Sequence, residues 1–576
     1  MGWITGAWRP NPDARQKLTG RHTRAECIAD TNQLIIYGSG LPETFFHGVL
    51  EKETTGWVVS GIGISSGDSP RLMLLSDWQS LFQSDGNQSH LHTLNGHFAA
   101  IRWNQHGIDF FTDTFGLKNL YFHKAENSVL FSTRLDTLLP LTTGCDIDWH
   151  GFGSRWVGTH GYGTGSFIKG IDRLSQCGSA RIDADTGLLD LQHNRWTPSQ
   201  NESSPEQVNR LLSAFTTLPM SAGKKLSLGL SGGFDSRILL ALLINQPKDN
   251  WQTHTFGAAD QPDRQLADNL ARLTDTPHYP LPEPRLSTEQ IIEQLPSFVG
   301  QTLFTSLPHT MIRLSPYRQL QKMGVFVIDG AFGEIARRRL AQRIYLQKSR
   351  ALRNEDFEQL LPLFAFQRAD IFKDEINESL HKGFQEELLT EFERMPPVRK
   401  VGDENWLDLF SVRTQAPNAG GPEQSRSDAI LPNYMAYLQP QFVDAVLNLP
   451  LRHRKNGIML RNYLTENNPE LCDSPLVKGV RSYPFWMKDK PAAIWTRLKY
   501  MFQEPYQDTA EIDLLRQLET YIRDKAASTG VQTYGPYDNG KVEKVIDLTF
   551  NESDTNAAHQ LNWWLTFDTF RELLNR

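Results

Sequence analysis

The segment Leu226-Ser-Leu-Gly-Leu-Ser-Gly-Gly-Phe-Asp-Ser-Arg-Ile-Leu-Leu240 joins the pattern of a buried strand to the pattern of a helix. Glycines at the joint let backbone N–H groups approach a ligand closely, because no Cβ stands in the way. The helix N-terminus adds unpaired donors and a partial positive charge, which suits a pyrophosphate group. The segment therefore predicts a phosphate-binding loop, and we expect its contacts to come from Leu230, Ser231, Gly232, Gly233, Asp235 and Ser236.

The polar side chains of this loop have separate expected roles. Ser231 and Ser236 supply hydroxyl donors, while Asp235 is suited to hold a magnesium ion against the phosphates. The lysine of a Walker loop is missing. Two other interpretations stay open. Gly229-Leu-Ser231-Gly-Gly233 matches the G-x-S-x-G elbow of serine hydrolases, with His278 or His309 as the histidine, and the segment also fits a turn with no ligand.

Length and composition narrow the class of protein. A chain of 576 residues exceeds what one hydrophobic core normally organises, so two or more domains are expected. A net charge of −7 without a basic block argues against nucleic-acid binding. The sequence has no run of 18 apolar residues and no signal-peptide pattern at its start, so we expect a cytoplasmic protein that does not enter a membrane.

The pattern of apolar and polar residues changes near residue 200. Residues 1–195 contain short apolar or alternating runs separated by Gly, Asn and Asp, which predicts a layered domain dominated by strands. Residues 196–205 are polar and rich in turn formers, typical of a linker. Residues 206–576 begin with strand and helix patterns in alternation, as in a doubly wound parallel sheet, and end in helical patterns. The fold class is therefore α/β.

With the Ser231 loop in place, the chain resembles the N-type ATP pyrophosphatases and, among them, the asparagine synthetases. Thr253-His-Thr-Phe-Gly257 is similar to the family's second strand, which implies that Phe256 and Gly257 bind ATP near the adenine. Phe326-Val-Ile-Asp-Gly-Ala-Phe-Gly-Glu334 resembles the family's second phosphate loop. That resemblance implies a phosphate contact at Gly330 and a second magnesium ligand at Glu334, whereas Ala331 stands where the family has glutamate.

A late segment and the N-terminal half extend this resemblance. Ser474-Pro-Leu-Val-Lys-Gly-Val480 resembles a family signature whose lysine, here Lys478, neutralises the polyphosphate during catalysis. Leu94-Asn-Gly-His-Phe-Ala99 resembles a strand of class II glutamine amidotransferase domains, which implies an Ntn-type αββα sandwich. Those glutaminases use a cysteine at residue 2 as the nucleophile, and this chain has Gly2. We therefore expect a degenerate domain without glutaminase activity, as in β-lactam synthetases and lasso-peptide cyclases.

The resemblance implies an ATP-dependent ligase that forms an amide. A carboxylate substrate (a small molecule, a sugar acid or a peptide) would attack ATP, and an amine or ammonia would then displace AMP. Intramolecular amide closure, as in a lasso-peptide or β-lactam cyclase, and an inactive scaffold stay open. A partner protein from the same biosynthetic cluster is also expected.

Two further segments have two interpretations each. Arg413–Arg426 contains a Gly-Gly-Pro turn signal beside Glu423 and Arg426, and it is either part of the acceptor site or a surface loop. Arg337-Arg-Arg339 follows the second loop and either steers phosphate or forms a solvated helical face.

Overall fold

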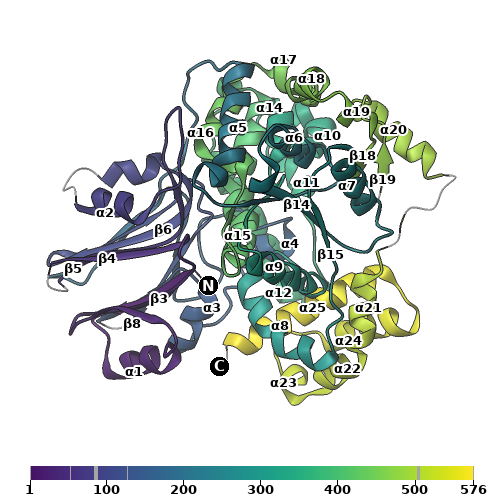
Figure 1. Ribbon diagram of the computed structural model, residues 1–576. Coiled ribbons are helices and arrows are strands. Elements are labelled where there is room, and N and C mark those ends of the chain that lie inside the picture. The colour runs from purple at the N-terminus through teal and green to yellow at the C-terminus, as the bar shows by residue number, and fades with distance from the viewer. Residues whose placement is uncertain are drawn as a thin grey trace.

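Two six-stranded antiparallel sheets form the N-terminal half of the molecule (Figure 1). The computed structural model describes residues 2–51, 54–83, 88–125, 127–479, 481–501, 506 and 508–574. The first sheet has the order β10 (Ile171–Leu174), β8 (Leu120–Ala125), β9 (Ser128–Ser132), β1 (Trp3–Trp8), β3 (Leu34–Ser39), β2 (Glu26–Asp30). The second has the order β12 (Leu189–Gln192), β11 (Ser179–Asp183), β7 (Gly107–Thr112), β6 (Asn95–Asn104), β5 (Thr55–Ile64), β4 (Phe45–Glu51).

Side-chain alternation along these strands produces the layers. In β6, Ala99 and Ile101 enter the core between the two sheets, while Phe98 and Ala100 face the opposite side. Helix α2 (Leu75–Gln83) packs on that opposite side, and α1 (Pro12–Arg21) packs on the outer face of the first sheet. Because successive side chains of a strand point to opposite faces, each sheet buries both of its faces. The predicted αββα sandwich is confirmed.

A five-stranded parallel sheet organises the C-terminal half. Its order is β15 (His278–Leu281), β14 (Trp251–Phe256), β13 (Leu226–Gly229), β16 (Phe326–Ile328), β17 (Asn433–Tyr434). The chain therefore moves outward from β13 in one direction and then returns to add strands on its other side. In open parallel sheets, ligands bind at the carboxyl ends of the strands where the order reverses, here between β13 and β16. The predicted doubly wound sheet is confirmed.

Helices cover both faces of this sheet (Figure 1). Phe326 and Ile328 of β16 join the main core, whereas Val327 between them packs in a separate cluster with Leu320. Leu320 lies in α9 (Leu314–Lys322). The other helices that the site uses are α5 (Pro205–Ser221), α6 (Phe234–Leu243), α7 (Pro262–Leu273), α8 (Thr288–Thr302), α10 (Gln342–Arg353), α14 (Asp403–Gln415), α15 (Gly421–Asp428) and α16 (Pro440–Leu447).

The C-terminal end of the chain is helical, as its sequence predicts. It consists mainly of α21 (Ala510–Gln517), α22 (Glu519–Ala527), α24 (Asn539–Asn551) and α25 (Thr555–Leu574). Trp564 and Phe567 of α25 are fully buried, and the Phe567 ring packs against Phe152 and Phe304. Among the described residues, no helix is long and apolar enough to span a membrane.

A fully buried ion cluster joins the two halves. The Asp428 carboxylate in α15 lies 2.7 Å from Lys118 Nζ and 2.9 Å from His97 Nε2, both in the N-terminal half. Beside it, the Gly96 N–H donates to Gln439 Oε1 at 2.8 Å. Burial raises the pKa of Asp428, but His97 and Lys118 outweigh burial and lower it to about 2.

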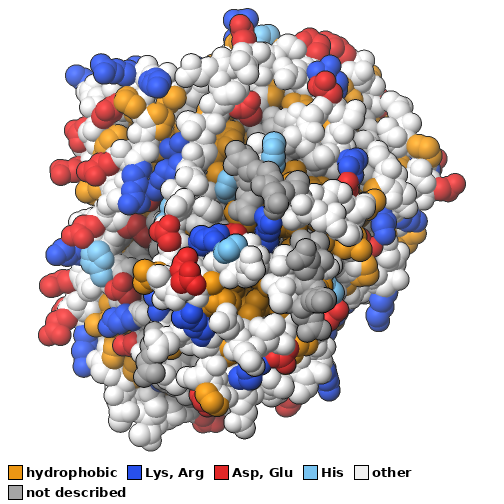
Figure 2. All heavy atoms as spheres, turned by 90° about the vertical axis from the view of Figure 1, so that its left-hand side faces the viewer, with side chains coloured by type: hydrophobic (Ala, Val, Ile, Leu, Met, Phe, Trp, Pro, Cys, Tyr) orange, Lys and Arg blue, Asp and Glu red, His pale blue; other side chains and the backbone are white. Residues whose placement is uncertain are grey.

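The outer face of the N-terminal half carries acidic and basic side chains side by side (Figure 2).

Replacing Asp428 with alanine tests this cluster. The change leaves Lys118 buried without its partner, so we expect a loss of about 3–5 kcal/mol in the free energy of unfolding at pH 7. The folded-state pKa of Asp428 lies below that of an unfolded aspartate, about 4. The stabilisation is therefore complete above about pH 4 and disappears as the pH falls towards about 2. Urea unfolding at several pH values measures both effects.

The half-exposed ion pair of Asp172 with Lys124, 3.4 Å apart, provides the control. Asp172→Ala should cost less than about 1 kcal/mol, because exposed ion pairs contribute little. Equal losses for the two variants would contradict a special role of the buried cluster.

Candidate functional site

The Ser231 loop lies at the carboxyl end of β13, where the strand order reverses. Its hydrogen bonds are largely internal. Ser231 Oγ lies 2.8 Å from Ser236 Oγ and accepts from the Gly233 N–H at 3.2 Å, and the Ser231 N–H donates to Ser236 Oγ. The Gly232 N–H donates to Asp263 Oδ1 in the first turn of α7, at 2.9 Å. The loop is therefore held mainly by its own hydrogen bonds, and the Asp263 carboxylate accepts from one of its N–H donors.

The second loop, Asp329–Glu334, packs directly on the first turn of α6. A Cβ added to Gly333 would lie 2.5 Å from the Asp235 Cβ, and one added to Gly330 would lie 2.8 Å from the Ser236 nitrogen. Glycine is therefore required at both positions for the two loops to meet. The structure brings together the predicted residues Asp235, Ser236 and Gly330.

A cavity of about 290 Å³ opens beside the Ser231 loop. Leu230, Ser231, Phe256 and Gly257, all predicted ATP contacts, lie in its wall. The Phe256 ring meets the Tyr317 ring edge-on, with centroids 5.2 Å apart. Gly257 has φ +100°, and a Cβ there would clash with the side chain of Gln261. The remaining lining residues are Gly229, His254, Thr255, Gln261, Asp263, Glu283, Arg313, Tyr317 and Asp329.

His254 is a cavity residue that the sequence analysis missed. It is almost fully buried, and its Nδ1 lies 2.8 Å from the Ser227 hydroxyl. Burial, with a smaller contribution from His278, lowers the pKa of His254 to about 3. The imidazole is therefore neutral at physiological pH. The only sequence signal was a histidine within the strand pattern of residues 251–256.

The segment with Lys478 docks on the Ser231 loop. It forms a short hairpin of β18 (Leu476–Lys478) and β19 (Arg481–Tyr483), while Val480 lies outside the described residues. The Val477 N–H donates to the Gly232 carbonyl at 3.0 Å, so the exposed Lys478 is one residue away from the loop. The structure thus brings Lys478 next to the predicted phosphate site.

Arg237, also missed by the sequence analysis, holds this segment in place. Its fully buried guanidinium donates to the carbonyls of Leu471, Ser474 and Pro475, and to that of Gly232 at 3.4 Å. The Arg237 side chain therefore connects α6 and the Ser231 loop with residues 471–475, which precede Lys478 in the chain. An arginine at the end of a loop motif carries no local sign of partners more than 230 residues away.

The two predicted magnesium ligands flank an arginine. Asp235 Oδ1 accepts from Arg337 Nε at 2.8 Å, and Asp235 Oδ2 accepts from Arg337 Nη2. Burial lowers the pKa of Arg337, but Asp235 and, more weakly, Glu334 outweigh burial and raise it. Within the described residues, no three His, Cys, Asp or Glu side chains form a cluster suited to a metal ion. Magnesium binding by Asp235 and Glu334 stays a prediction.

The interpretation of Arg337–Arg339 as a solvated helical face is wrong for its first two residues. Arg337 and Arg338 are both buried; Arg337 pairs with the partly buried Asp235, and Arg338 pairs with the buried Glu404 and Asp408. They lie at the end of a short 3₁₀ helix, η5 (Gly333–Arg337), and not on an α-helix.

The serine-hydrolase interpretation gains no support from the described geometry. His278 Nε2 lies 2.9 Å from Asp268 and its Nδ1 lies 2.8 Å from Thr253. His309 Nδ1 is buried without a hydrogen-bond partner. No hydrogen bond among the described residues joins either histidine to Ser231.

A second cavity, of about 170 Å³, adjoins the first and shares Tyr317 and Asp329 with it. Glu423 and Arg426 of α15 lie in its wall and pair with each other. Arg426 is 9% exposed, and its Nε and Nη1 are buried without a partner. The wall of this cavity therefore includes a guanidinium that has two buried nitrogens without a hydrogen-bond partner.

The predicted turn at Gly420-Gly421-Pro422 is wrong. A π-helical segment, η7 (Ala416–Gly420), joins α14 to α15 without reversing the chain. The glycines serve close packing: a Cβ on Gly421 would lie 3.0 Å from the Leu117 carbonyl, and one on Gly420 would lie 3.1 Å from the Phe332 ring. The segment thus contacts both the N-terminal half and the second loop.

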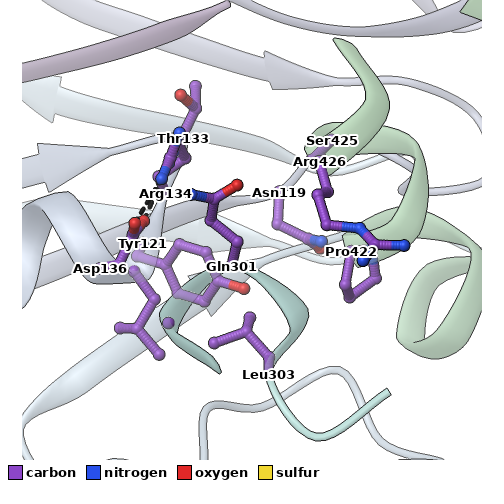
Figure 3. A pocket seen from close by; sticks show the side chains of 12 residues that line it. Asn119, Tyr121, Thr133, Arg134, Asp136, Gln301, Leu303, Pro422, Ser425 and Arg426 are labelled. Carbon is purple, nitrogen blue, oxygen red and sulfur yellow. Dashed lines mark hydrogen bonds and ion pairs between the residues drawn. The ribbon is translucent and has the colours of Figure 1, made fainter. Parts of the chain in front are cut away.

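Arg426 also lines a small cavity of about 30 Å³ between the two halves (Figure 3). In Figure 3, Asn119 lies beside Pro422 and Arg426, and the Arg134–Asp136 ion pair lies across the cavity. Asn119 Oδ1 is buried without a partner. The space suffices for about one water molecule.

Comparison with protein families gives one match. The family described as asparagine synthase matches residues 207–467, which include all five parallel strands and both loops but not Lys478. This match supports the asparagine synthetase family for the C-terminal half. Curated protein sequences give no match.

Solved structures show only weak similarity to the chain. The allosteric regulatory enzyme of purine biosynthesis is 9% identical, with 40% of this chain and 60% of that chain covered and a TM-score of 0.22. Glutamine phosphoribosylpyrophosphate amidotransferase from B. subtilis, complexed with ADP and GMP, is 10% identical over 57% and 81%, with a TM-score of 0.22. Glutamine-dependent NAD+ synthetase from Acinetobacter baumannii, complexed with ADP, is 18% identical over 29% and 31%, with a TM-score of 0.18. Scores this low support no conclusion about this chain.

Replacing Arg237 with methionine should loosen the Lys478 hairpin. Hydrogen bonds from a charged donor contribute about 1.5–3 kcal/mol each, so the loss of one or more should speed amide exchange of Val477 by roughly ten- to hundredfold. Hydrogen–deuterium exchange of peptides covering residues 471–479 measures this. Arg272→Met, at an exposed position of α7, should leave the exchange unchanged. Slow exchange in both variants would show that other contacts hold the hairpin.

Proposed function

We propose that this protein is an ATP-dependent ligase that activates a carboxylate as an acyl-adenylate and forms an amide. The cavity at the reversal of the parallel sheet carries the proposal, because residues of the Ser231 loop and of β14 line it together. The asparagine synthase match over the same residues supports it. In this proposal, adenosine lies against Phe256 and Gly257, and the phosphates lie at the Ser231 loop.

The first step would join the substrate to AMP. A carboxylate oxygen attacks the α-phosphorus, the bond from that phosphorus to the bridging oxygen breaks, and pyrophosphate leaves with the electron pair. The Ser231 and Ser236 hydroxyls and the N-terminus of α6 would bind the phosphates, and Lys478 would offset the developing charge. Such a site works mainly by positioning and charge stabilisation. Magnesium, the expected companion of ATP, would neutralise phosphate oxygens.

The second cavity would hold the acceptor acid. It adjoins the proposed nucleotide site at Tyr317 and Asp329, so a carboxylate there can reach the α-phosphate. The Arg426 guanidinium in this wall would pair with an anionic or carbonyl group at the far end of the substrate. A volume of about 170 Å³ favours a small acid over a peptide. A partner protein from the same biosynthetic cluster stays a prediction.

Asp329 is our candidate for the base of the second step. Its side chain lies where the two cavities meet, and the Ala331 N–H donates to its Oδ1 at 2.9 Å. The side chain is exposed in the cavity wall, but the protein atoms around it desolvate the carboxylate and raise the pKa of Asp329, which favours proton uptake. The amine nitrogen attacks the acyl carbon, the bond to the AMP oxygen breaks, and AMP leaves with the electron pair. Asp329 accepts the proton that the nitrogen loses.

The amine would come from ammonia or from the substrate itself. Gly2 is buried beside Thr44 and Ser60 and has no side chain that could attack glutamine. We therefore propose a ligase without its own glutaminase. Intramolecular closure requires only that the amine belong to the acceptor molecule. Release of glutamate from glutamine by the purified protein would contradict this part of the proposal.

The adenylation step is tested by ATP–pyrophosphate exchange with a panel of small carboxylic acids. We expect exchange that depends on one class of acid. Ser231→Ala and Ser236→Ala should each reduce it by roughly ten- to hundredfold, because each removes one hydrogen bond to a charged group. Ser221→Ala, at the exposed end of α5, is the control. Loss of all activity in the Ser231 variant alone, together with labelling of Ser231 by a fluorophosphonate, would favour a serine hydrolase.

The base is tested by Asp329→Asn. Asparagine keeps the acceptor for the Ala331 N–H but takes up no proton. We expect near-normal ATP–pyrophosphate exchange, while amide formation falls by roughly 10²–10⁴-fold. Product analysis with ammonium as the amine measures the second value. Equal losses in both assays would show that Asp329 contributes to adenylation or binding instead.

A further inference from the structure

Two consecutive arginines that follow the second loop, Arg337 and Arg338, contact different helices. Arg338 Nε and Nη1 lie 3.5 Å from Glu404 and 3.6 Å from Asp408, which places the side chain in a buried ion cluster of α14. Arg337 points the other way, to Asp235 at the N-terminus of α6. Arg338 adopts φ +57°, and Phe332 before the turn adopts φ +61°. Left-handed backbone at non-glycine residues costs free energy and persists only where surrounding contacts enforce it.

Arg337 meets Asp235 through one edge of its guanidinium only. Nε and Nη2 donate to the two carboxylate oxygens, and Nη1 has no acceptor among the described residues. Packing fixes this arrangement. The guanidinium lies 5.0 Å from the centre of the Phe234 ring, and its side chain is 9% exposed. A Cβ on Gly457 would lie 3.0 Å from the Arg337 Cγ.

The pair does not fit a metal site at Asp235. Both carboxylate oxygens already accept from a guanidinium that is nine-tenths buried. A divalent cation bound to the same carboxylate would lie next to this fixed positive charge, and like charges at contact distance repel strongly in a poorly solvated site. Glu334, the other predicted ligand, also interacts with Arg337. The positive charge that a metal ion would bring is therefore already present in the chain.

We propose that Arg337, and not a divalent metal, is the cation at Asp235, and that its free Nη1 binds the polyphosphate of ATP. The inference rests on the proposed function. Asp235 is the second residue of α6, so an anion at the N-terminus of this ten-residue helix lies beside the Arg337 guanidinium. Asp235 acts as a positioning residue that orients the guanidinium. Magnesium then reaches the site only as part of the Mg–ATP complex.

Two measurements on the full chain test this inference. The first is ATP binding by calorimetry, in EDTA and in magnesium. The wild type should lose no more than about tenfold in affinity when magnesium is removed. Arg337→Met should lose at least about a hundredfold in EDTA, the typical effect of removing a charged hydrogen bond to phosphate. Arg337→Lys should recover part of this loss, because lysine keeps the charge but not the two-point contact.

The second measurement is binding of Mn²⁺, as a spectroscopic substitute for magnesium, without nucleotide. Paramagnetic resonance should show no tight Mn²⁺ site that depends on Asp235 in the wild type. In Arg337→Met the carboxylates of Asp235 and Glu334 lose the guanidinium, and Mn²⁺ binding should increase at least tenfold. The double variant Asp235→Asn/Arg337→Met removes both charges of the pair, so it leaves no unpaired buried charge and should fold. In this variant the increase in Mn²⁺ binding should disappear. Arg343→Met, on the exposed face of α10, is the control.

A tight Mn²⁺ site in the wild type that Asp235→Asn removes would overturn the inference. The inference would also fail if Arg337→Met bound ATP in EDTA as tightly as the wild type does. Failure of the wild type to bind ATP even with magnesium would instead contradict the proposed function, and the inference with it.

Discussion

The contact between Asp235 and the glycines of the second loop sets the geometry of the whole site. Gly330 and Gly333 meet the first turn of α6 without a Cβ, so the loops after β13 and β16 lie in direct contact. Because these strands are neighbours in the sheet, their carboxyl ends converge at one edge. Arg337 then reaches Asp235 from the end of the second loop. A β-carbon at Gly333 would force the two loops apart and break this pair.

Buried charges also define how the two halves fit. Asp428 forms ion pairs with Lys118 and His97 of the N-terminal half. The helix that contains Asp428, α15, also contains Glu423 and Arg426. The same helix therefore forms the domain interface on one side and the wall of the second cavity on the other. The N-terminal half therefore has a structural role in this arrangement, because its contacts hold the helix that forms the wall of the second cavity.

Local sequence patterns predicted the fold and the strand, loop and helix around Ser231, but not the long-range contacts of this loop. The Ser231 loop and the strands around it follow from residues close together in the chain, where glycine content and side-chain alternation carry the information. The partners of Arg237 and Arg337 were beyond this reasoning, since they are distant in sequence and the sequence does not distinguish a buried arginine from an exposed one. The Gly-Gly-Pro turn was predicted wrongly because glycine at residues 420 and 421 permits close packing of helices as well as a turn.

The hydrogen bond from Gly232 to Asp263 has a consequence for affinity. Asp263 is a tethered carboxylate, and its local concentration at the loop is set by the chain and not by the solution. Any anion that uses the Gly232 N–H must displace it, so binding at this donor is an exchange of acceptors and not the filling of an empty one. The same exchange runs in reverse when the anion leaves. Asp263 thus lowers the affinity of the Gly232 N–H for every other anion, and it helps to displace an anion that is already bound there.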